Sequence, residues 1–234
     1  MTNEIKVNIS KSTKIIIQAK ESDVNLNEPL YAINWFSTKR EWLYHFYNFL
    51  AVGRVKKVGG AAFFKGKITK TVLDEKNAAR SLILIVRYPG GQSFKALLEM
   101  TYFKLVSIFR LLSVKDFSFG FTQKIKLDET GVLRDNLCYA VHHFKAESTA
   151  SFFGKLDTVL ADKVKVKYAG KMAAQLFFQK ADDPPRALPN LMDGIVIFES
   201  KFEDDISKMI ESPIYQSLIE ALESSYIGFV KRTI

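Results

Sequence analysis

The chain contains the same short motif twice, and this duplication constrains its fold more than any other feature. The segment 31–36, YAINWF, returns 108 positions later at 139–144 as YAVHHF. At the same offset, Phe119-Gly120-Phe121 returns as Ile227-Gly228-Phe229. The order of predicted strands and helices between these anchors also repeats. We therefore predict two copies of one small α+β unit, and 234 residues are ample for two such units with real cores.

Each copy reads as strand, helix, strand, strand, helix, strand, from its hydrophobic periodicity and its turn residues. The first repeat is predicted at 31–127 and the second at 137–234, with a linker at 128–136 and an N-terminal arm at 1–30. Within the arm, residues 14–18 could add an edge strand. The predicted strands are 30–36, 61–68, 81–88 and 117–125, then 137–144, 172–179, 192–199 and 226–233; the helices are 39–55, 93–112, 148–164 and 203–224.

A strand order of this kind makes a four-stranded antiparallel sheet with both helices on one face. The other face would be exposed, which is unfavourable when it is apolar. Here the strands 82–86 and 195–198 are apolar on both faces, so each free face needs a cover. The other repeat is the obvious cover. The sequence thus predicts two ferredoxin-like βαββαβ repeats that pack sheet to sheet as a closed or nearly closed α/β barrel.

Two segments carry a resemblance to a known superfamily. The segment 211–218, ESPIYQSL, resembles the Ser-Pro-x-Tyr segment in the second helix of a functionally uncharacterised branch of the dimeric α/β-barrel superfamily, and 99–102 is its weaker counterpart. The strand end and turn at 87–90 resemble the segment that precedes this helix. The resemblance covers 31–126 and 137–233 and implies a pseudo-dimeric barrel. Superfamily members include cofactor-free monooxygenases, isomerases, haem-dependent peroxidases and proteins without known activity, so the fold is a weak guide to chemistry.

The net charge of +9 is distributed unevenly. Residues 31–127 hold 17 Lys and Arg against 5 acidic residues, whereas 128–234 hold 13 against 16. The basic first repeat could hold an anionic partner; alternatively, the repeats attract each other, or the lysines serve solubility. Cys138 is the single cysteine, so no internal disulfide forms. No secretory signal and no membrane-spanning segment is found, and we expect a cytoplasmic protein without a membrane partner.

His142 and His143 are the sharpest candidate site, because they interrupt an apolar strand. Alternation sends one toward the barrel interior and the other toward the helices. An interior histidine could act as a general base or a haem ligand; the alternative is a core histidine bonded to the backbone. Asn34 and Trp35 stand at the matching positions of the first repeat, so Asn34 is a candidate ligand-binding residue.

Further candidates lie at strand ends and on the second helices. Arg87 would need a carboxylate or an anionic ligand if it were buried. Its counterpart in the second repeat is Ile197 or Phe198, with Glu199 near Tyr88 or Pro89. An Arg87–Glu199 pair across the pseudo-twofold would be structural. Tyr102 and Tyr215 could bring a hydroxyl to a pocket mouth or simply pack in the core. The candidate ligand-binding residues are Asn34, Arg87, Tyr88, Glu199, Tyr102 and Tyr215.

No phosphate-binding loop, serine elbow or metal-binding spacing is present, and we expect no cofactor and no metal. The leading hypothesis is a protein that binds a small organic ligand, anionic or enolisable, in a pocket between sheet and helices. It could be a cofactor-independent monooxygenase- or isomerase-like enzyme with His142 or His143 as base; whether it is an enzyme stays open. The alternatives are a non-catalytic interaction protein, with the apolar helix 100–112 as a docking or homo-oligomer surface, and RNA binding. RNA binding is disfavoured because the strand 82–88 lacks the aromatic pattern of RNA-recognition modules.

Overall fold

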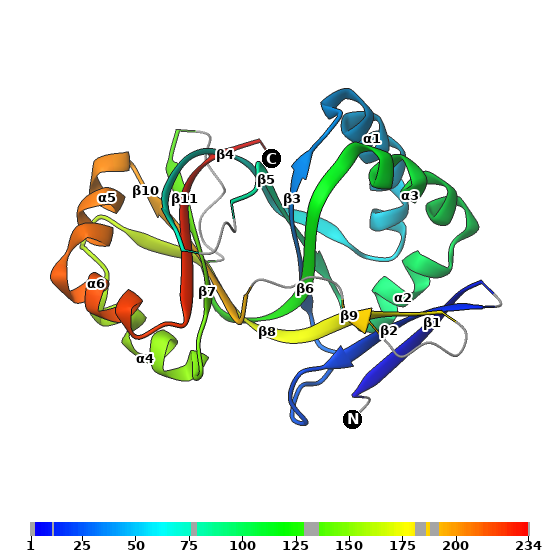
Figure 1. Cartoon of the computed structure of the whole chain (residues 1–234), viewed down its shortest axis with the longest axis horizontal. Coiled ribbons are helices and arrows are strands. Elements are labelled where there is room, and N and C mark those ends of the chain that lie inside the picture. Colours follow the sequence, from blue (N-terminus) through cyan, green and yellow to red (C-terminus); the bar gives the residue numbers. More distant parts are fainter. Residues whose placement is uncertain are drawn as a thin grey trace.

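The computed structural model describes residues 3–10, 12–75, 79–128, 136–180, 186–187 and 192–233. The first repeat follows the predicted order, with its second helix split in two (Figure 1). Its elements are β3 (Leu30–Thr38), α1 (Glu41–Lys57), β4 (Ala61–Asp74), β5 (Leu82–Tyr88), α2 (Gly91–Glu99), α3 (Thr101–Ser113) and β6 (Val114–Leu127).

The second repeat has the same plan, and the short strand β9 is added between its second and third strands. Its elements are β7 (Cys138–Lys145), α4 (Thr149–Val159), β8 (Lys165–Lys180), β9 (Arg186–Ala187), β10 (Gly194–Ser200), α5 (Glu203–Glu211), α6 (Pro213–Glu220) and β11 (Ser224–Arg232). The strand β8 is longer than the predicted 172–179, because α4 already ends at Val159 and the strand begins at Lys165.

The two sheets join edge to edge into one closed barrel, which confirms the predicted fold class. The strand order is β8-β10-β7-β11-β4-β5-β3-β6, and β6 then pairs with β8 to close the ring. The last strand of each repeat pairs with the second strand of the other, β11 with β4 and β6 with β8. No barrel edge is left unpaired between the repeats. The helices lie outside, so each repeat forms one flank of the molecule (Figure 1).

The barrel interior is a packed core built from both repeats. Tyr31, Trp35, Tyr139, Tyr168 and Tyr226 all point inward and are at most 2% exposed. Rings of opposite repeats touch there: the centroids of Tyr31 and Tyr168 are 4.9 Å apart, and those of Trp35 and Tyr226 are 5.1 Å apart. The expectation that each apolar sheet face covers the other is therefore confirmed.

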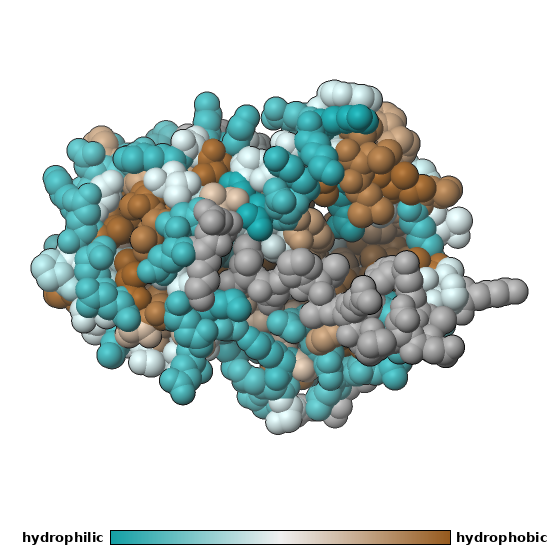
Figure 2. All heavy atoms as spheres, in the orientation of Figure 1, coloured by the Kyte–Doolittle hydropathy of each residue, from teal (hydrophilic) through white to brown (hydrophobic). Residues whose placement is uncertain are grey.

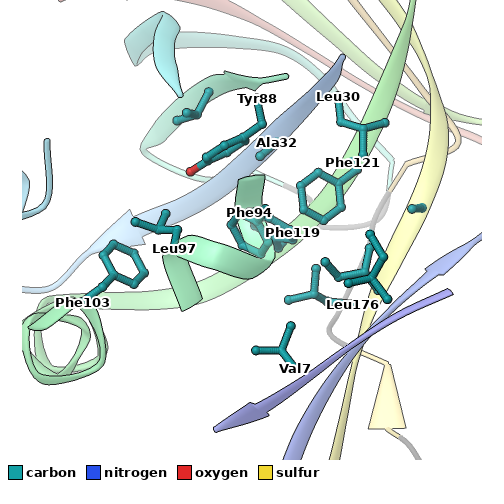
Figure 3. Packing of buried hydrophobic residues seen from close by; sticks show 14 of the residues in the cluster. Val7, Leu30, Ala32, Tyr88, Phe94, Leu97, Phe103, Phe119, Phe121 and Leu176 are labelled. Carbon is teal, nitrogen blue, oxygen red and sulfur yellow. The ribbon is translucent and has the colours of Figure 1, made fainter. Parts of the chain in front are cut away.

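Two further cores lie between the sheet and the helices of each repeat. In the first repeat, Phe94 of α2 packs on Phe119 and Phe121 of β6 (Figure 3). In the second repeat, Phe152 of α4 stacks on Phe144 of β7, with ring centroids 4.1 Å apart. Each sheet is thus covered on both faces, which explains why its strands are apolar on both faces.

The N-terminal arm is a β-hairpin that widens the sheet beyond the barrel. It consists of β1 (Glu4–Ser10) and β2 (Thr13–Ala19), which contains the predicted edge strand at 14–18. Thr13–Ala19 pairs with Lys180–Ala174, the half of β8 that extends past the barrel. β1 packs on α2, where Gly91 allows close approach: a Cβ at that position would lie 2.6 Å from Cδ1 of Ile5.

The sequence predicts one long second helix in each repeat, and this is wrong in both. Residues 93–112 divide at Met100 and residues 203–224 divide at Ser212, where ψ reaches 120° and 142°. Pro213 explains the second break, because proline disfavours a helical residue before it and lacks the N–H that the helix needs. Ser212 then caps α6 by accepting the N–H of Tyr215 at 3.3 Å.

The apolar side of α1 that the sequence displays does not face the sheet. Trp42 and Phe49 are 69% and 77% exposed, and Phe46 is also exposed. The buried side instead carries Leu43, Tyr44, Tyr47 and Ala51. Tyrosine can be buried in a core because its ring is largely apolar. The spacing of Trp42, Phe46 and Phe49 along this helix therefore marks its exposed side, and not the side that packs on the sheet.

Some predicted segments lie wholly or partly outside the described residues. These are most of the linker 128–136 and the polar turn ending at Asn77, together with the Pro-rich stretches 182–185 and 188–190. Among the residues described, no helix combines the length and the apolar character that a membrane crossing requires.

The shared interior predicts how the repeats behave when separated, and the domain boundaries at 127 and 137 stay a prediction until this is tested. Fragments 1–131 and 132–234 would each expose one inner sheet face to water. Every large apolar ring exposed in this way loses about 1.5–3 kcal/mol of burial free energy. We expect each fragment alone to self-associate and an equimolar mixture to recover the native near-UV circular dichroism. Size-exclusion chromatography with light scattering checks the masses. A folded monomer of either fragment alone would contradict the shared-core account.

Candidate ligand site in the second repeat

His142 and His143 point to opposite sides of β7, as strand alternation predicts. His142 faces the helix layer, with its ring centroid 5.4 Å from that of Phe152. His143 faces the barrel interior, where its ring lies 4.6 Å from Trp35. Both side chains are buried. They therefore belong to two separate environments and cannot act together at one site.

His142 joins three secondary-structure elements through hydrogen bonds between side chains. Its Nδ1 lies 2.8 Å from the Tyr215 hydroxyl of α6, and its Nε2 lies 3.2 Å from Ser225 Oγ of β11. A neutral imidazole has one donor and one acceptor nitrogen, so it can satisfy both bonds at once. The partners are side chains, not the backbone groups that the alternative interpretation named.

Burial keeps this histidine uncharged. The imidazole lies wholly inside the protein, and desolvation lowers its pKa from about 6.5 to about 3. Phe144 and Phe152 supply the apolar surroundings, with ring centroids 5.4 Å from the imidazole. The network of His142, Tyr215 and Ser225 is therefore a set of neutral hydrogen-bonding groups at ordinary pH.

His143 has fewer polar contacts than His142. Its Nδ1 lies 3.2 Å from Sδ of Met192, and its Nε2 has no hydrogen-bond partner among the described residues. Burial, with a smaller effect of the neighbouring His142, lowers the pKa of its imidazole to about 3. The ring is packed between Trp35 and Tyr226, and it fills the barrel interior.

The first repeat has no counterpart to the His142 network. Asn34 stands at the position of His142, and its Nδ2 donates to the carbonyl oxygens of Ala32 and Leu84 at 3.3 and 3.2 Å. In the sheet, Phe119 pairs with Asn34 in the same way as Ile227 pairs with His142. Two residues earlier on each strand, the first repeat therefore has Phe117 where the second has Ser225. The divergence of the repeats thus concentrates polar groups in the second one.

Tyr102 and Tyr88, the other candidates of the first repeat, do not approach Asn34 in a shared pocket. Tyr102 is 38% exposed and stacks under the guanidinium of Arg54, whose Cζ lies 4.3 Å from the ring centroid. Tyr88 is buried against Phe94, and this burial raises the pKa of its hydroxyl. Both tyrosines are packing residues in this structure.

Arg87 and Glu199 occupy equivalent positions, which corrects the predicted register. Arg87 pairs with Tyr31, and Glu199 pairs with Tyr139, the equivalent tyrosine of the second repeat. The counterpart of Arg87 is therefore Glu199, and not Ile197 or Phe198 as the sequence predicts. The two strands stand four places apart around the ring, and no ion pair joins these side chains among the described residues. Arg87 is exposed, whereas Glu199 is 8% exposed and its Oε2 lacks a partner among the described residues.

A groove of about 460 Å³ opens between α4 and α6, on the outer side of the second repeat. One side chain, Lys155, carries a positive charge into it, and no ion pair is found for it in the described part of the chain. The rest of its wall contains both hydroxyl and apolar side chains. The lining consists of Ser148, Ser151, Phe152, Lys155, Thr158, Val159, Pro213, Ile214, Ser217, Leu218, Ala221 and Leu222.

The groove and the histidine network share one side chain and one helix. Phe152 lines the groove and also contacts His142 on its other side. Tyr215, which bonds His142, belongs to the same helix as the groove residues Ile214 and Leu218. Phe152 therefore lies next to both the groove and the imidazole, which brings the histidine network close to the groove.

Of the candidate site residues named from the sequence, His142 and Tyr215 are the pair that a hydrogen bond joins in the described part of the chain. Sequence reasoning missed Ser225 and the groove residues Phe152, Lys155 and Ser217. Ser225 had a usable signal, because it stands where the first repeat has Phe117. The groove residues had none, since only the packing of α4 against α6 brings them together. Within the described chain, no three His, Cys, Asp or Glu side chains gather in a geometry suited to a metal ion.

No protein-family model and no curated protein matches this sequence. Among solved structures, the chain is similar to a candidate monooxygenase from Fusobacterium nucleatum subsp. nucleatum, with 10% identity, a TM-score of 0.50 and coverage of 89% of this chain and 94% of that one. It is also similar to a mutant chlorite dismutase from Candidatus Nitrospira defluvii, with 11% identity, a TM-score of 0.51 and the same coverage. At such identities the likeness shows the fold alone, the dimeric α/β-barrel architecture.

Removal of the Tyr215 hydroxyl tests whether the histidine network stabilises the fold. Tyr215→Phe leaves Nδ1 of His142 buried without a partner, so we expect a loss of about 1–3 kcal/mol in the free energy of unfolding. Tyr102→Phe is the matched control, and it should change stability by less than about 0.5 kcal/mol because that hydroxyl is at the surface. Urea titration measures both; equal losses would contradict the network's role.

The lowered pKa of His142 predicts a loss of stability in acid. In the unfolded chain this imidazole is protonated below about pH 6.5, whereas in the folded chain it stays neutral down to about pH 3. The free energy of unfolding therefore falls as the pH falls between these values. Between pH 7 and 5 this amounts to about 2 kcal/mol for one histidine. His142→Asn, the residue of the first repeat, should reduce that slope by about half, because the equally buried His143 keeps its own contribution. His45→Asn at the surface should keep the slope. Urea titrations at several pH values decide; an unchanged slope in the first variant overturns the account.

Proposed function

We propose that the protein binds a small organic molecule with an acidic group in the groove between α4 and α6. The observation that carries this proposal is the groove itself: a hollow of about 460 Å³ that combines an apolar wall with a single lysine. Its volume lies within the range of about 300–1,000 Å³ typical of small-molecule sites. The fold supports ligand binding only as an architecture that hosts many activities.

The polar groups of the groove favour a carboxylate or a similar anion. Lys155 offers the one charged side chain of the lining. Ser148 precedes α4 without using its side chain to cap the helix, so its hydroxyl is available to a ligand. Together with Ser151 it stands at the helix N-terminus, where backbone N–H groups favour negative charge. A ligand anion at this end of the groove could thus accept hydrogen bonds from the Ser148 and Ser151 hydroxyls and from the Lys155 ammonium group.

The apolar wall favours a ring or a branched hydrocarbon part in the same ligand. Phe152, Val159 and Leu218 form the deep side, and Pro213 and Ile214 the rim on α6. Phe152 and Leu218 are buried, while Ile214 is 63% exposed and would gain a partner from a bound molecule. Burial of apolar area contributes about 25 cal/mol per Å², which makes this wall the larger source of affinity.

His142 gives this groove a second candidate function, catalysis without a cofactor of the monooxygenase or isomerase type. The imidazole lies behind Phe152, so a substrate would reach it only if that ring rotated away. An imidazole with a pKa of about 3 is also a base roughly a thousandfold weaker than free histidine. Binding is therefore the better supported function, and catalysis stays a prediction to be tested by turnover of the ligand.

We also propose that the chain belongs to the Ser-Pro-x-Tyr branch of the superfamily. The segment has a definite structural role that supports this: Ser212 caps α6, Pro213 starts it, and Tyr215 bonds His142. Self-association through residues 100–112 and a cytoplasmic location likewise stay predictions. RNA binding remains the least favoured alternative, because the aromatic rings of the sheets are buried inside the barrel.

Blocking the groove tests the binding proposal. Calorimetry with 2-naphthoate and uncharged 2-naphthamide serves as the assay, since both carry the same ring system. Ser217→Trp fills the groove from an exposed helix position and should abolish binding of both. Glu220→Trp, exposed on the same helix but outside the lining, should leave binding intact.

Lys155→Met separates the charge preference from the groove. It should weaken naphthoate about fivefold and leave the amide unchanged, because a partly exposed ion pair contributes on the order of 1 kcal/mol. Failure of both probes to bind the wild-type chain, or binding that Ser217→Trp does not reduce, would contradict the proposal.

A further inference from the structure

The first repeat presents a broad apolar surface to solvent, which we call the α1–α3 face. Leu111 is 68% exposed and Leu105 is 61% exposed, comparable to Trp42 and Phe49. Figure 2 shows these hydrophobic side chains gathered over α1 and α3, at the upper right of the view. The face consists of Trp42, Phe46, Phe49 and Val52 of α1 and of Tyr102, Leu105, Ile108, Leu111 and Leu112 of α3.

The two helices of the face run antiparallel and side by side. The N–H of Arg40, before α1, donates to the carbonyl oxygen of Ser113 at the end of α3 at 3.3 Å. Phe46 and Phe109 touch at mid-length, with ring centroids 5.5 Å apart. Arg54 near the end of α1 covers Tyr102 at the start of α3. The exposed apolar residues thus lie on two neighbouring helices, over a stretch of about 15 Å along each.

The helices that carry this face are strongly basic. Residues 39–57 and 101–113 contain seven basic side chains, namely Lys39, Arg40, Arg54, Lys56, Lys57, Lys104 and Arg110, against the single acidic Glu41. Lys39 and Arg40 stand before the first turn of α1, and Lys56 and Lys57 in its last turn. Exposed aromatic and aliphatic side chains therefore lie between positive charges at both ends of α1.

This charge disfavours a second copy of the chain as the partner. A symmetric dimer places the same patch on both sides of the interface, so the basic residues at the two ends of α1 would meet basic residues of the second copy. Such like-charge contacts oppose association even where apolar area is buried. A partner must instead be apolar at its centre and negative at its edge.

We propose that the α1–α3 face docks on the surface of a bilayer that contains anionic lipid. Tryptophan, phenylalanine and leucine enter the boundary between headgroups and acyl chains, while lysine and arginine contact lipid phosphates. The expectation of no membrane partner rests only on the lack of a segment that could span a bilayer. Lying on a bilayer requires no span, only an exposed amphipathic face.

The two tryptophans make this proposal measurable in the unmodified chain. Trp42 is 69% exposed on the face, whereas Trp35 is 1% exposed inside the barrel. Entry into lipid should therefore shift the emission of Trp42 to shorter wavelength and leave that of Trp35 unchanged. Brominated acyl chains should quench the shifted emission. The Trp42→Phe variant, still able to bind, should lose both signals, which assigns them to the face.

Co-sedimentation with vesicles measures the affinity directly. Vesicles of phosphatidylcholine with phosphatidylglycerol should bind the protein at low salt, and vesicles of phosphatidylcholine alone should bind it at least tenfold less. Phe49→Ser with Leu105→Ser should lower the partition coefficient tenfold or more. Phe202→Ser with Ile125→Ser is the matched control, because it removes two exposed apolar side chains that belong neither to the face nor to the groove, and it should change nothing.

The charge contribution has its own pair of variants. Lys56→Glu with Lys57→Glu reverses the basic end of α1 and should lower binding to the anionic vesicles several-fold. Lys163→Glu with Lys165→Glu makes the same change in net charge at exposed positions of the second repeat and should have a smaller effect. Equal effects of the two pairs would mean that only net charge matters, and would overturn the docking face.

Two other results would also overturn the proposal. The first is no binding to anionic vesicles at low salt. The second is self-association: a concentration-dependent dimer in sedimentation, with Trp42 emission already at short wavelength without lipid, would assign the face to a second copy. Neither result bears on the α4–α6 groove, which lies on the opposite flank of the molecule (Figure 1).

Discussion

The closed barrel depends on one constraint: each repeat has a sheet that is apolar on both faces, and its own helices cover only one. The pairings of β11 with β4 and of β6 with β8 solve this by joining the sheets into a ring. Rings such as Tyr31, Trp35, Tyr168 and Tyr226 then interlock across the interior. The hairpin and the helix layers are arranged around this shared core.

The filled interior decides where a ligand can bind. Because large aromatic side chains occupy the barrel, the groove that we propose as the ligand site lies in the helix layer instead. The second repeat supplies this groove between α4 and α6, close to the neutral network of His142, Tyr215 and Ser225. In the first repeat, Asn34 and Phe117 stand in place of His142 and Ser225. The helices α1 and α3 of that repeat expose apolar side chains to solvent, with basic residues around them. Duplication thus produced two flanks with different surfaces on one scaffold.

Much of the fold could be predicted from the sequence, because it follows from local patterns and from the duplicated motif. The alternation of His142 and His143 was readable for the same reason, since successive strand residues point to opposite faces. The breaks in the second helices were partly readable at Pro213, but Met100 carries no local signal. The register of Arg87 against Glu199 required the actual strand pairing, because a shift of one residue exchanges the two faces.

The sequence by itself determined the number of repeats, the order of their elements and the need for a second sheet over each apolar face. These properties follow from periodicity and from the unfavourable exposure of apolar area. Only the tertiary structure decided that Trp42, Phe46 and Phe49 face water while Tyr44 and Tyr47 are buried, and that Phe152 and Lys155 line one groove with Ser217. Such neighbours are set by the packing of helices on a sheet, and no pattern within a single segment encodes that contact.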